Sequence, residues 1–147
     1  MEFMGSYGDA ETLSLKGQKF LHTHDKTMST YQKAYRAFEE ALEIDPENKD
    51  ALYYIGLMHL LGYGRDQDIP KALSYFEDAS QLKDPRAYNA LGYIYWNAPE
   101  TIERDGTKRM RFGSINRDAT KAYQMFAKSS GMGNVNAKYN LGSMYLS

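Results

Sequence analysis

The chain of 147 residues contains no cysteine. This absence excludes a disulfide framework and any metal site built from thiolates. It leaves the compartment open, because cytosolic and secretory repeat domains both fold without disulfides.

Long apolar runs and an excess of one charge are also missing. No run approaches the roughly 18–20 apolar residues that span a bilayer, so we predict no direct membrane insertion. Eighteen basic residues against 19 acidic ones give a net charge of −1, which offers no basic field for nucleic acid or anionic lipid. The first residues lack the apolar core of a signal peptide, and we expect residues 1–8 to be disordered or vector-derived.

Aromatic residues, by contrast, are abundant: 13 tyrosines, six phenylalanines and one tryptophan. Such rings, together with many small residues, suit closely packed helices whose polar ring tips reach water. Hydrophobic residues make up 42% of the chain, which is enough for a packed domain and argues against disorder.

A short motif recurs along the chain. Residues 51–59, 87–95 and 137–145 each begin with alanine and carry an apolar residue at the fifth position, glycine at the sixth and an aromatic ring at the ninth. A weaker copy occupies residues 12–20. Glycine inside a helix costs about 1 kcal/mol relative to alanine, a cost that is offset if a second helix approaches closely there. The glycines are Gly17, Gly56, Gly92 and Gly142.

A second motif follows the copies at residues 12–20, 51–59 and 87–95, and it occupies residues 33–41, 71–79 and 121–129. It has Lys-Ala, then phenylalanine four residues after the alanine and a small residue three further on, the spacing of one helix face. Each unit is therefore a helix A, a turn and a helix B. The sequence predicts an all-α fold, a right-handed α-solenoid of antiparallel helix pairs. One solenoid domain over 9–147 would contain units at about 9–46, 47–84 and 85–132 and a half repeat at 133–147.

The turn between the two motifs resembles that of Sel-one-like repeats. Residues 62–72 match the family pattern G-x-G-V-x-x-D-x-x-K-A except for Arg65, which stands in place of valine. Residues 115–122 keep the latter half of this pattern, whereas residues 41–48 are similar to a tetratricopeptide junction. The resemblance covers roughly residues 10–147.

This resemblance implies a scaffold that binds a protein or peptide partner. Family members include the substrate-receptor subunit of the endoplasmic-reticulum membrane ubiquitin-ligase complex, so a fragment of such a degradation adaptor is one interpretation. The resemblance does not choose between the endoplasmic-reticulum lumen and the cytoplasm. The alternative to a partner of another kind is a homodimer, formed through the binding groove on the A helices or through the flank of the last helix.

The face of helix A opposite the packing stripe is the predicted partner-binding groove. In a solenoid the A helices gather on a concave surface, where aromatic rings offer contact area and amides bond to a peptide backbone. The residues expected there are Tyr53, Leu57, Leu60, Asn89, Tyr93, Trp96 and Asn140. The alternative is that some of these rings only cover the seam between units.

A long insertion at residues 97–117 is the second candidate. It is predicted to be an irregular loop whose basic residues contact a partner, or else a tolerated excursion. Without a regular helix or stacking aromatics it is a poor nucleic-acid site. The basic residues concerned are Arg104, Lys108, Arg109 and Arg111.

No residues point to catalysis, a metal or a cofactor. His22 and His24 are interpreted as surface residues, and His59 as a packed ring with one hydrogen bond. No base, nucleophile and oxyanion donor occur in a plausible arrangement, so an enzyme is disfavoured. Acidic residues near expected helix starts, such as Asp68, are interpreted as caps.

Overall fold

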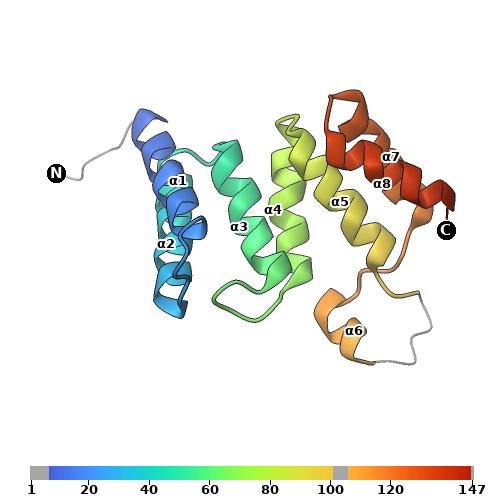
Figure 1. Cartoon of the computed structure of the whole chain (residues 1–147), viewed down its shortest axis with the longest axis horizontal. Coiled ribbons are helices and arrows are strands. Elements are labelled where there is room, and N and C mark those ends of the chain that lie inside the picture. The colour runs from blue at the N-terminus through green and yellow to red at the C-terminus, as the bar shows by residue number, and fades with distance from the viewer. Residues whose placement is uncertain (1–6, 101–105, 147) are drawn as a thin grey trace.

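The computed structural model describes residues 7–100 and 106–146, in which every regular element is a helix (Figure 1). Residues 1–6 lie outside this range, and Tyr7 and Gly8 already belong to the first helix. The helices of the described part are α1 (Tyr7–Leu21), α2 (Met28–Ile44), α3 (Lys49–Leu61), α4 (Ile69–Gln81), α5 (Pro85–Asn97), α6 (Gly106–Phe112), α7 (Ala119–Gly131) and α8 (Val135–Leu146).

The helices stand side by side in a row of antiparallel pairs (Figure 1). Helices α1, α3 and α5 are the A helices of three units, and they pack against α2, α4 and α7 as their B helices. Helix α8 is a further A helix, packed on α7. The predicted all-α solenoid is confirmed.

Small polar residues begin most of these helices. In each case a side-chain oxygen accepts a hydrogen bond from a backbone N–H two or three residues later, which satisfies a donor that has no partner within the helix. Asp68 does this for Lys71 at the start of α4, as predicted. The other caps of this kind are Thr27, Asn48, Asp84, Asp118 and Asn134.

The helical glycines lie where a phenylalanine of helix B presses against helix A. A Cβ atom added to Gly17 would come within 2.6 Å of the Phe38 ring, and one added to Gly92 would come within 2.6 Å of Phe126. Gly56 faces Phe76 in the same way, at 2.8 Å. Since carbon atoms attract best at about 3.5–4.0 Å, a side chain at these positions would push the helices apart. The close approach predicted from the glycines is confirmed at these three positions, whereas a Cβ added to Gly142 would meet nothing within 4 Å.

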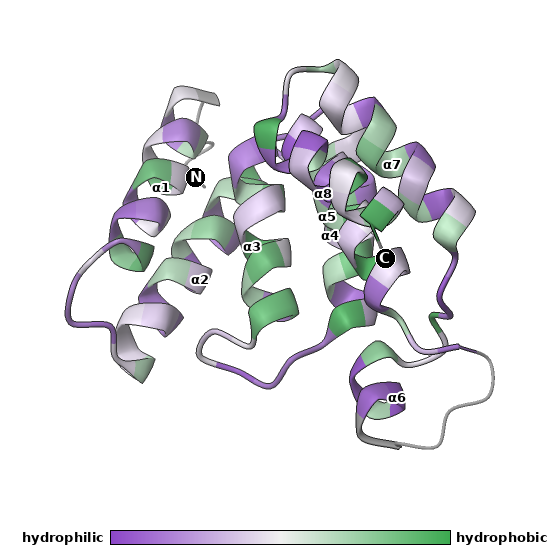
Figure 2. Ribbon diagram, turned by 45° about the vertical axis from the view of Figure 1, so that its right-hand side comes forward, coloured by the Kyte–Doolittle hydropathy of each residue, from purple (hydrophilic) through white to green (hydrophobic). Residues whose placement is uncertain are grey.

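Fully buried phenylalanines and alanines form the core between the helices. One cluster joins α1, α2 and α3 around Phe38, and another joins α3, α4, α5 and α6 around Phe76. In Figure 2, the end of α3 that leads into the following turn is largely hydrophobic, whereas that turn is largely hydrophilic. No helix among the described residues is both long and apolar enough to cross a membrane.

The insertion contains a helix that the sequence did not predict. Helix α6 occupies Gly106–Phe112 and lies apart from the row of the other helices (Figure 1). Phe112 is only 5% exposed and joins the core cluster around Phe76. A single aromatic anchor thus orders a segment whose composition carries no helical periodicity. The expectation of an irregular loop is wrong for this part.

Candidate functional site

Helix α5 carries the most accessible aromatic ring of the predicted helix A surface. Tyr93 is 47% exposed, and Trp96, one turn further on, is half-buried. The guanidinium of Arg117 lies 4.2 Å from the centre of the Trp96 ring, a distance at which a cation is attracted to an aromatic face. Tyr93 is therefore the most accessible aromatic ring of the predicted set.

Two amides connect this surface across the last seam. The Nδ2 of Asn140 on α8 donates a hydrogen bond of 2.8 Å to the Oδ1 of Asn89 on α5. Each amide has further capacity: Asn89 retains its N–H groups, and Asn140 retains its carbonyl oxygen. Both residues are half-buried, so they can still meet a peptide laid over them.

The three predicted residues of α3 lie at the seam between units instead. Tyr53 and Leu57 are half-buried and pack against the core cluster around Phe76. Leu60 is 6% exposed and is part of that cluster, so the prediction that it lines an accessible surface is wrong. The physical reason is that Leu60 is covered by the other members of this cluster, which come from α4, α5 and α6. For these positions we favour the alternative of a seam-covering role, because all three pack within or against that cluster.

Arg109 holds the insertion together. Its Nη1 donates to the backbone oxygens of Gly113 at 2.8 Å and Ile115 at 2.9 Å. Its Nη2 donates to the backbone oxygen of Glu100 at 3.0 Å and to Oδ1 of Asn116 at 2.8 Å. The guanidinium is thus engaged within the segment itself, and its geometry supports a structural role rather than a partner contact.

The other basic residues of the insertion differ in accessibility. Lys108 is half-buried and Arg111 is exposed, both on α6. Arg104 lies outside the described residues.

A buried stack of rings surrounds His59. The ring is 3% exposed, and its Nε2 shares a hydrogen bond of 3.0 Å with the Tyr35 hydroxyl, so the predicted packed ring with one hydrogen bond is confirmed. It also stacks on Tyr75 at 5.8 Å between ring centres. Burial, and then the positive charges of Arg65 and Lys71, lower the pKa of His59 to about 4. The imidazole is therefore neutral near pH 7 and serves packing.

The Tyr35 ring in this stack also carries a cation. The guanidinium carbon of Arg65 lies 3.4 Å from the ring centre, a close cation–π contact. Arg65 is the residue that stands in place of the family valine, so the departure from the motif has a specific partner.

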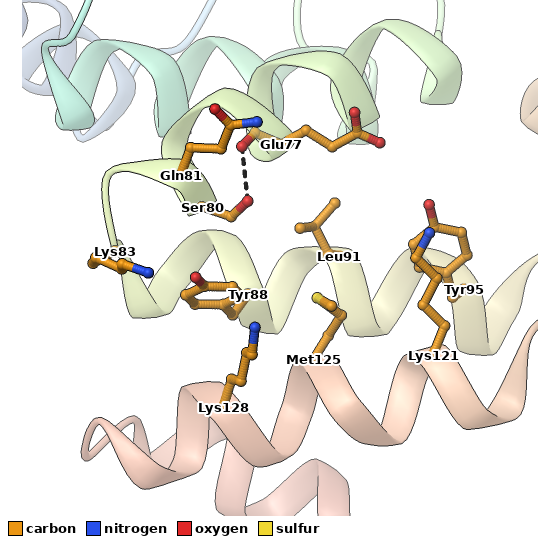
Figure 3. A pocket seen from close by; sticks show the side chains of 10 residues that line it. All are labelled: Glu77, Ser80, Gln81, Lys83, Tyr88, Leu91, Tyr95, Lys121, Met125 and Lys128. Atoms are coloured by element: carbon orange, nitrogen blue, oxygen red, sulfur yellow. Dashed lines mark hydrogen bonds between the residues drawn. The ribbon is translucent and has the colours of Figure 1, made fainter.

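A groove of about 640 Å³ opens between α4 and α7, with α5 as its floor (Figure 3). We call it the lysine groove. Glu77 and Ser80 line it from α4, and Lys83 lines it from the turn that follows α4. Lys121 and Lys128 line it from α7. The groove lies on the side of α5 that faces the B helices, so it is separate from the helix A surface.

Aromatic rings on α5 hold the two lysines of α7. The Lys121 ammonium lies 4.6 Å from the centre of the Tyr95 ring, and that of Lys128 lies 5.4 Å from Tyr88 (Figure 3). Each ammonium is thereby positioned over the groove by the ring face beneath it. Both ion pairs found in the described part of the chain involve Arg86, so these lysines have no carboxylate partner there.

A metal centre finds no support in the described ranges. Within 7–100 and 106–146, no three histidine, aspartate or glutamate side chains gather where they could hold an ion.

A family model for the Sel1 repeat matches residues 49–84, 85–108, 109–134 and 135–147. These matches adjoin one another from α3 to the end of the chain, and the second and third divide inside α6. The chain belongs to the Sel1 repeat family. Sel1 repeat proteins are generally protein-interaction scaffolds, of a fold that is typically non-enzymatic.

Solved structures of Sel1-type repeat proteins are similar to this chain. A Sel1 repeat protein from Oxalobacter formigenes is 28% identical with a TM-score of 0.69, over 95% of this chain and 50% of its own. Helicobacter pylori cysteine-rich protein B shares the fold at 18% identity and a TM-score of 0.58, over 91% of this chain and 90% of its own.

A third similar structure is c5321, a protective antigen present in uropathogenic Escherichia coli strains that displays an SLR fold. It is 21% identical with a TM-score of 0.51, over 94% of this chain and 34% of its own. The present chain thus spans half of the Oxalobacter protein and about a third of c5321. No match to the chain was found among curated proteins.

The lysine groove is the feature that sequence reasoning missed. Its signal is present in the third Sel1 unit: Lys121, Met125 and Lys128 occur at i, i+4 and i+7, which is one face of a helix. The repeat motifs consist of residues that the units share, whereas this face is formed by residues in which the units differ.

Proposed function

We propose that the chain is a non-enzymatic protein-interaction module that binds a peptide or protein segment on its helix A surface. The observation that carries this proposal is the exposure of Tyr93, 47% of whose surface is accessible although it lies mid-helix on a packed solenoid. Trp96 and the spare hydrogen-bonding groups of Asn89 lie on the same helix.

The chemistry of these residues suits a peptide. A tyrosine or tryptophan buries a large area on binding at little cost in conformational entropy, which is why such rings are frequent energetic centres of interfaces. Amides next to them can bond to the backbone of an extended segment, whatever its side chains.

Site-specific photocrosslinking tests the proposal. Benzoylphenylalanine replaces Tyr93 in the full chain, the chain is irradiated in extract from its native cells, and adducts are identified by mass spectrometry. The control is the same replacement at Tyr123, which is 45% exposed on α7. We expect a discrete adduct at position 93 that is lost with Trp96→Ala and is missing at position 123.

Equal adducts at positions 93 and 123, or none at 93, would contradict a binding surface on α5. Circular dichroism of each variant shows whether the solenoid is intact, so that a loss of binding is not confused with a loss of folding.

Self-association is the second candidate function, and the exposure of α8 favours it. Apolar and aromatic side chains gather on this helix with most of their surface accessible, namely Val135 at 74%, Tyr139 at 75%, Tyr145 at 75% and Leu146 at 91%. Exposed patches of this kind mark interfaces in soluble proteins. The partner that covers α8 would be a second copy of the chain, related to the first by a twofold axis.

Light scattering over a hundredfold range of concentration distinguishes this candidate. A dimer that dissociates on dilution, and that Tyr139→Ser converts to a monomer, would support it. A monomer at every concentration would rule it out and leave the surface of α5 as the proposed site. The role in an endoplasmic-reticulum degradation adaptor that the resemblance implies stays a prediction.

A further inference from the structure

The furrow between two consecutive B helices is filled in one unit and open in the next. Between α2 and α4 it contains three rings: His59 stacks on Tyr75, and Tyr35 meets His59 edge to face. Leu42 and Tyr75 also pack against the same two clusters of buried residues. Between α4 and α7 the corresponding furrow is the lysine groove.

The sequence register of the repeats explains the difference. When the Ala-Phe pairs of the B helices are aligned, Ser80 of α4 corresponds to Leu42 of α2, and Met125 of α7 corresponds to Tyr75 of α4. A leucine and a tyrosine are thus exchanged for a hydroxymethyl group and a thinner, flexible thioether. The volume that those side chains fill in the first furrow is left open in the second.

The charge of the furrow changes as well. In the same register Lys128 of α7 corresponds to Asp78 of α4, so an acid is exchanged for a base. Three lysines then line the groove against a single carboxylate, Glu77 on the opposite wall. Like charges gathered without partners repel one another, and a bound anionic group would relieve that repulsion.

The backbone of Lys83 adopts a conformation that is unfavourable for a lysine. Its φ is 64°, in the left-handed region that favours glycine, and among the described residues it is the one non-glycine residue with positive φ. The aligned position after α7 is Gly133, with φ of 93°. A lysine is thus kept at the groove in a conformation that costs a side-chain-bearing residue free energy.

We propose that the lysine groove binds an acidic segment of a partner protein, with carboxylates on the three lysines and an aliphatic side chain on the floor. Met125 is half-buried over Leu91 on that floor, and methionine adapts its shape to an incoming side chain. Glu77 disfavours a uniformly anionic polymer and permits one basic residue in the segment.

An acidic peptide suits this groove better than nucleic acid does. Affinity for nucleic acid grows with the number of phosphates neutralised along an extended basic surface, and this groove offers three ammonium groups in a chain of net charge −1. The site is distinct from the helix A surface of the proposed function, and Tyr93→Ala separates the two because it should leave this groove unchanged.

Fluorescence anisotropy with a defined probe tests the inference. The probe is a fluorescein-labelled peptide of repeated Glu-Glu-Leu, and its comparison peptide repeats Gln-Gln-Leu. With the full chain at low salt we expect the acidic peptide to bind about tenfold more tightly, as three partly exposed charge pairs would allow. Lys121→Gln with Lys128→Gln should remove that preference. Lys138→Gln, an exposed lysine of α8, is the matched control and should retain it.

Two further variants separate binding from folding. Lys83→Gly should raise the midpoint of urea denaturation, because glycine accepts the positive φ without strain. The same substitution should weaken the binding of the acidic peptide, because it removes one of the three lysines. Ser80→Leu with Met125→Tyr should fill the groove as in the preceding unit and abolish binding although all three lysines remain.

The proposal is overturned if the acidic and amide peptides bind equally, or if Lys138→Gln weakens binding as much as the groove variants do. It is overturned as well if the filled variant binds like the wild type. A single-stranded oligonucleotide and phosphatidylserine vesicles are tested as competitors of the acidic peptide. If either displaces it at lower concentration, with the same dependence on the groove lysines, nucleic acid or an anionic lipid surface is the ligand instead of an acidic peptide.

Discussion

Single atoms decide how closely the two helices of a unit can approach each other. Gly92 lies where an added Cβ would come within 2.6 Å of the Phe126 ring, whereas an added Cβ at Gly142 would meet nothing within 4 Å. The same residue type in the same motif therefore has opposite consequences for stability at the two positions.

Alanine at each glycine measures this difference. We expect Gly92→Ala to lower the free energy of unfolding by about 1–3 kcal/mol, because the gain in helix propensity is outweighed by overpacking. Gly142→Ala should raise it by up to about 1 kcal/mol, since only the propensity changes. Urea denaturation followed by circular dichroism gives both values, and equal shifts of the same sign would contradict the close-approach argument.

His59 makes stability depend on pH. Its pKa is lowered from 6.5 to about 4 in the folded chain, first by burial and then by Arg65 and Lys71. The unfolded chain therefore binds more protons between these values, and stability falls as pH decreases from 6.5 through 4. We expect a loss on the order of 2 kcal/mol over that window. In His59→Phe, thermal melts at each pH should show a shallower decline, and an unchanged slope would assign it to other groups.

At the scale of helices, Arg86 joins two units. Its Nη2 lies 2.8 Å from Oδ1 of Asp50 on α3 and 2.9 Å from Oδ2 of Asp84, the cap of α5. Burial lowers the pKa of Arg86, but hydrogen bonds to the two carboxylates outweigh that effect and raise it above its ordinary value. The guanidinium also lies 4.6 Å from the centre of the Tyr53 ring.

Removal of this link should loosen the seam between α3 and α5. Arg86→Met keeps much of the stem but leaves Asp84, which is 3% exposed, without its charged partner. We expect a loss of about 2 kcal/mol in unfolding free energy, typical of hydrogen bonds to charged groups. Asp50→Asn should cost less, because its side chain is 47% exposed. A larger loss for Asp50→Asn would show that Asp84 does not depend on Arg86.

The helices themselves were largely predictable. The spacing of Ala, Gly and Phe predicts each A and B helix and the contact between them, because both signals are local and repeat in every unit. Helix α6 was not predictable, since one buried ring, Phe112, and one guanidinium, Arg109, hold it through contacts that have no period.

At the scale of the whole molecule, burial is uneven along the row. Helix α3 contributes seven buried residues, from Ala51 to Leu60, whereas α8 contributes only Ala137 among its described side chains. In a solenoid each unit is stabilised by its own contacts and those with its neighbours, so local opening should differ from helix to helix.

Hydrogen exchange with mass spectrometry tests this gradient. We expect amides of α8 to exchange faster than those of α3, with opening free energies lower by a few kcal/mol. A chain that ends at residue 134 should keep the exchange pattern of α1 to α5. Equal protection of α3 and α8 would mean that the chain unfolds as one cooperative unit, or that a second copy covers α8. A repeat at low concentration separates these two cases.

The sequence alone determined the fold class, the order of A and B helices, the reason for three of the four helical glycines and the packed state of His59. These features depend on residue types at fixed spacing, and spacing along a helix sets which side chains share a face. Only the tertiary structure decided which faces stay open. Leu60 became core because residues of α4, α5 and α6 gather around it, whereas Tyr93 of α5 remained accessible. Ser80 and Met125 left open the furrow whose counterpart one unit earlier contains Leu42 and Tyr75. The accessibility of a helix face depends on which side chains the neighbouring helix places against it, and it is therefore a property of two units together.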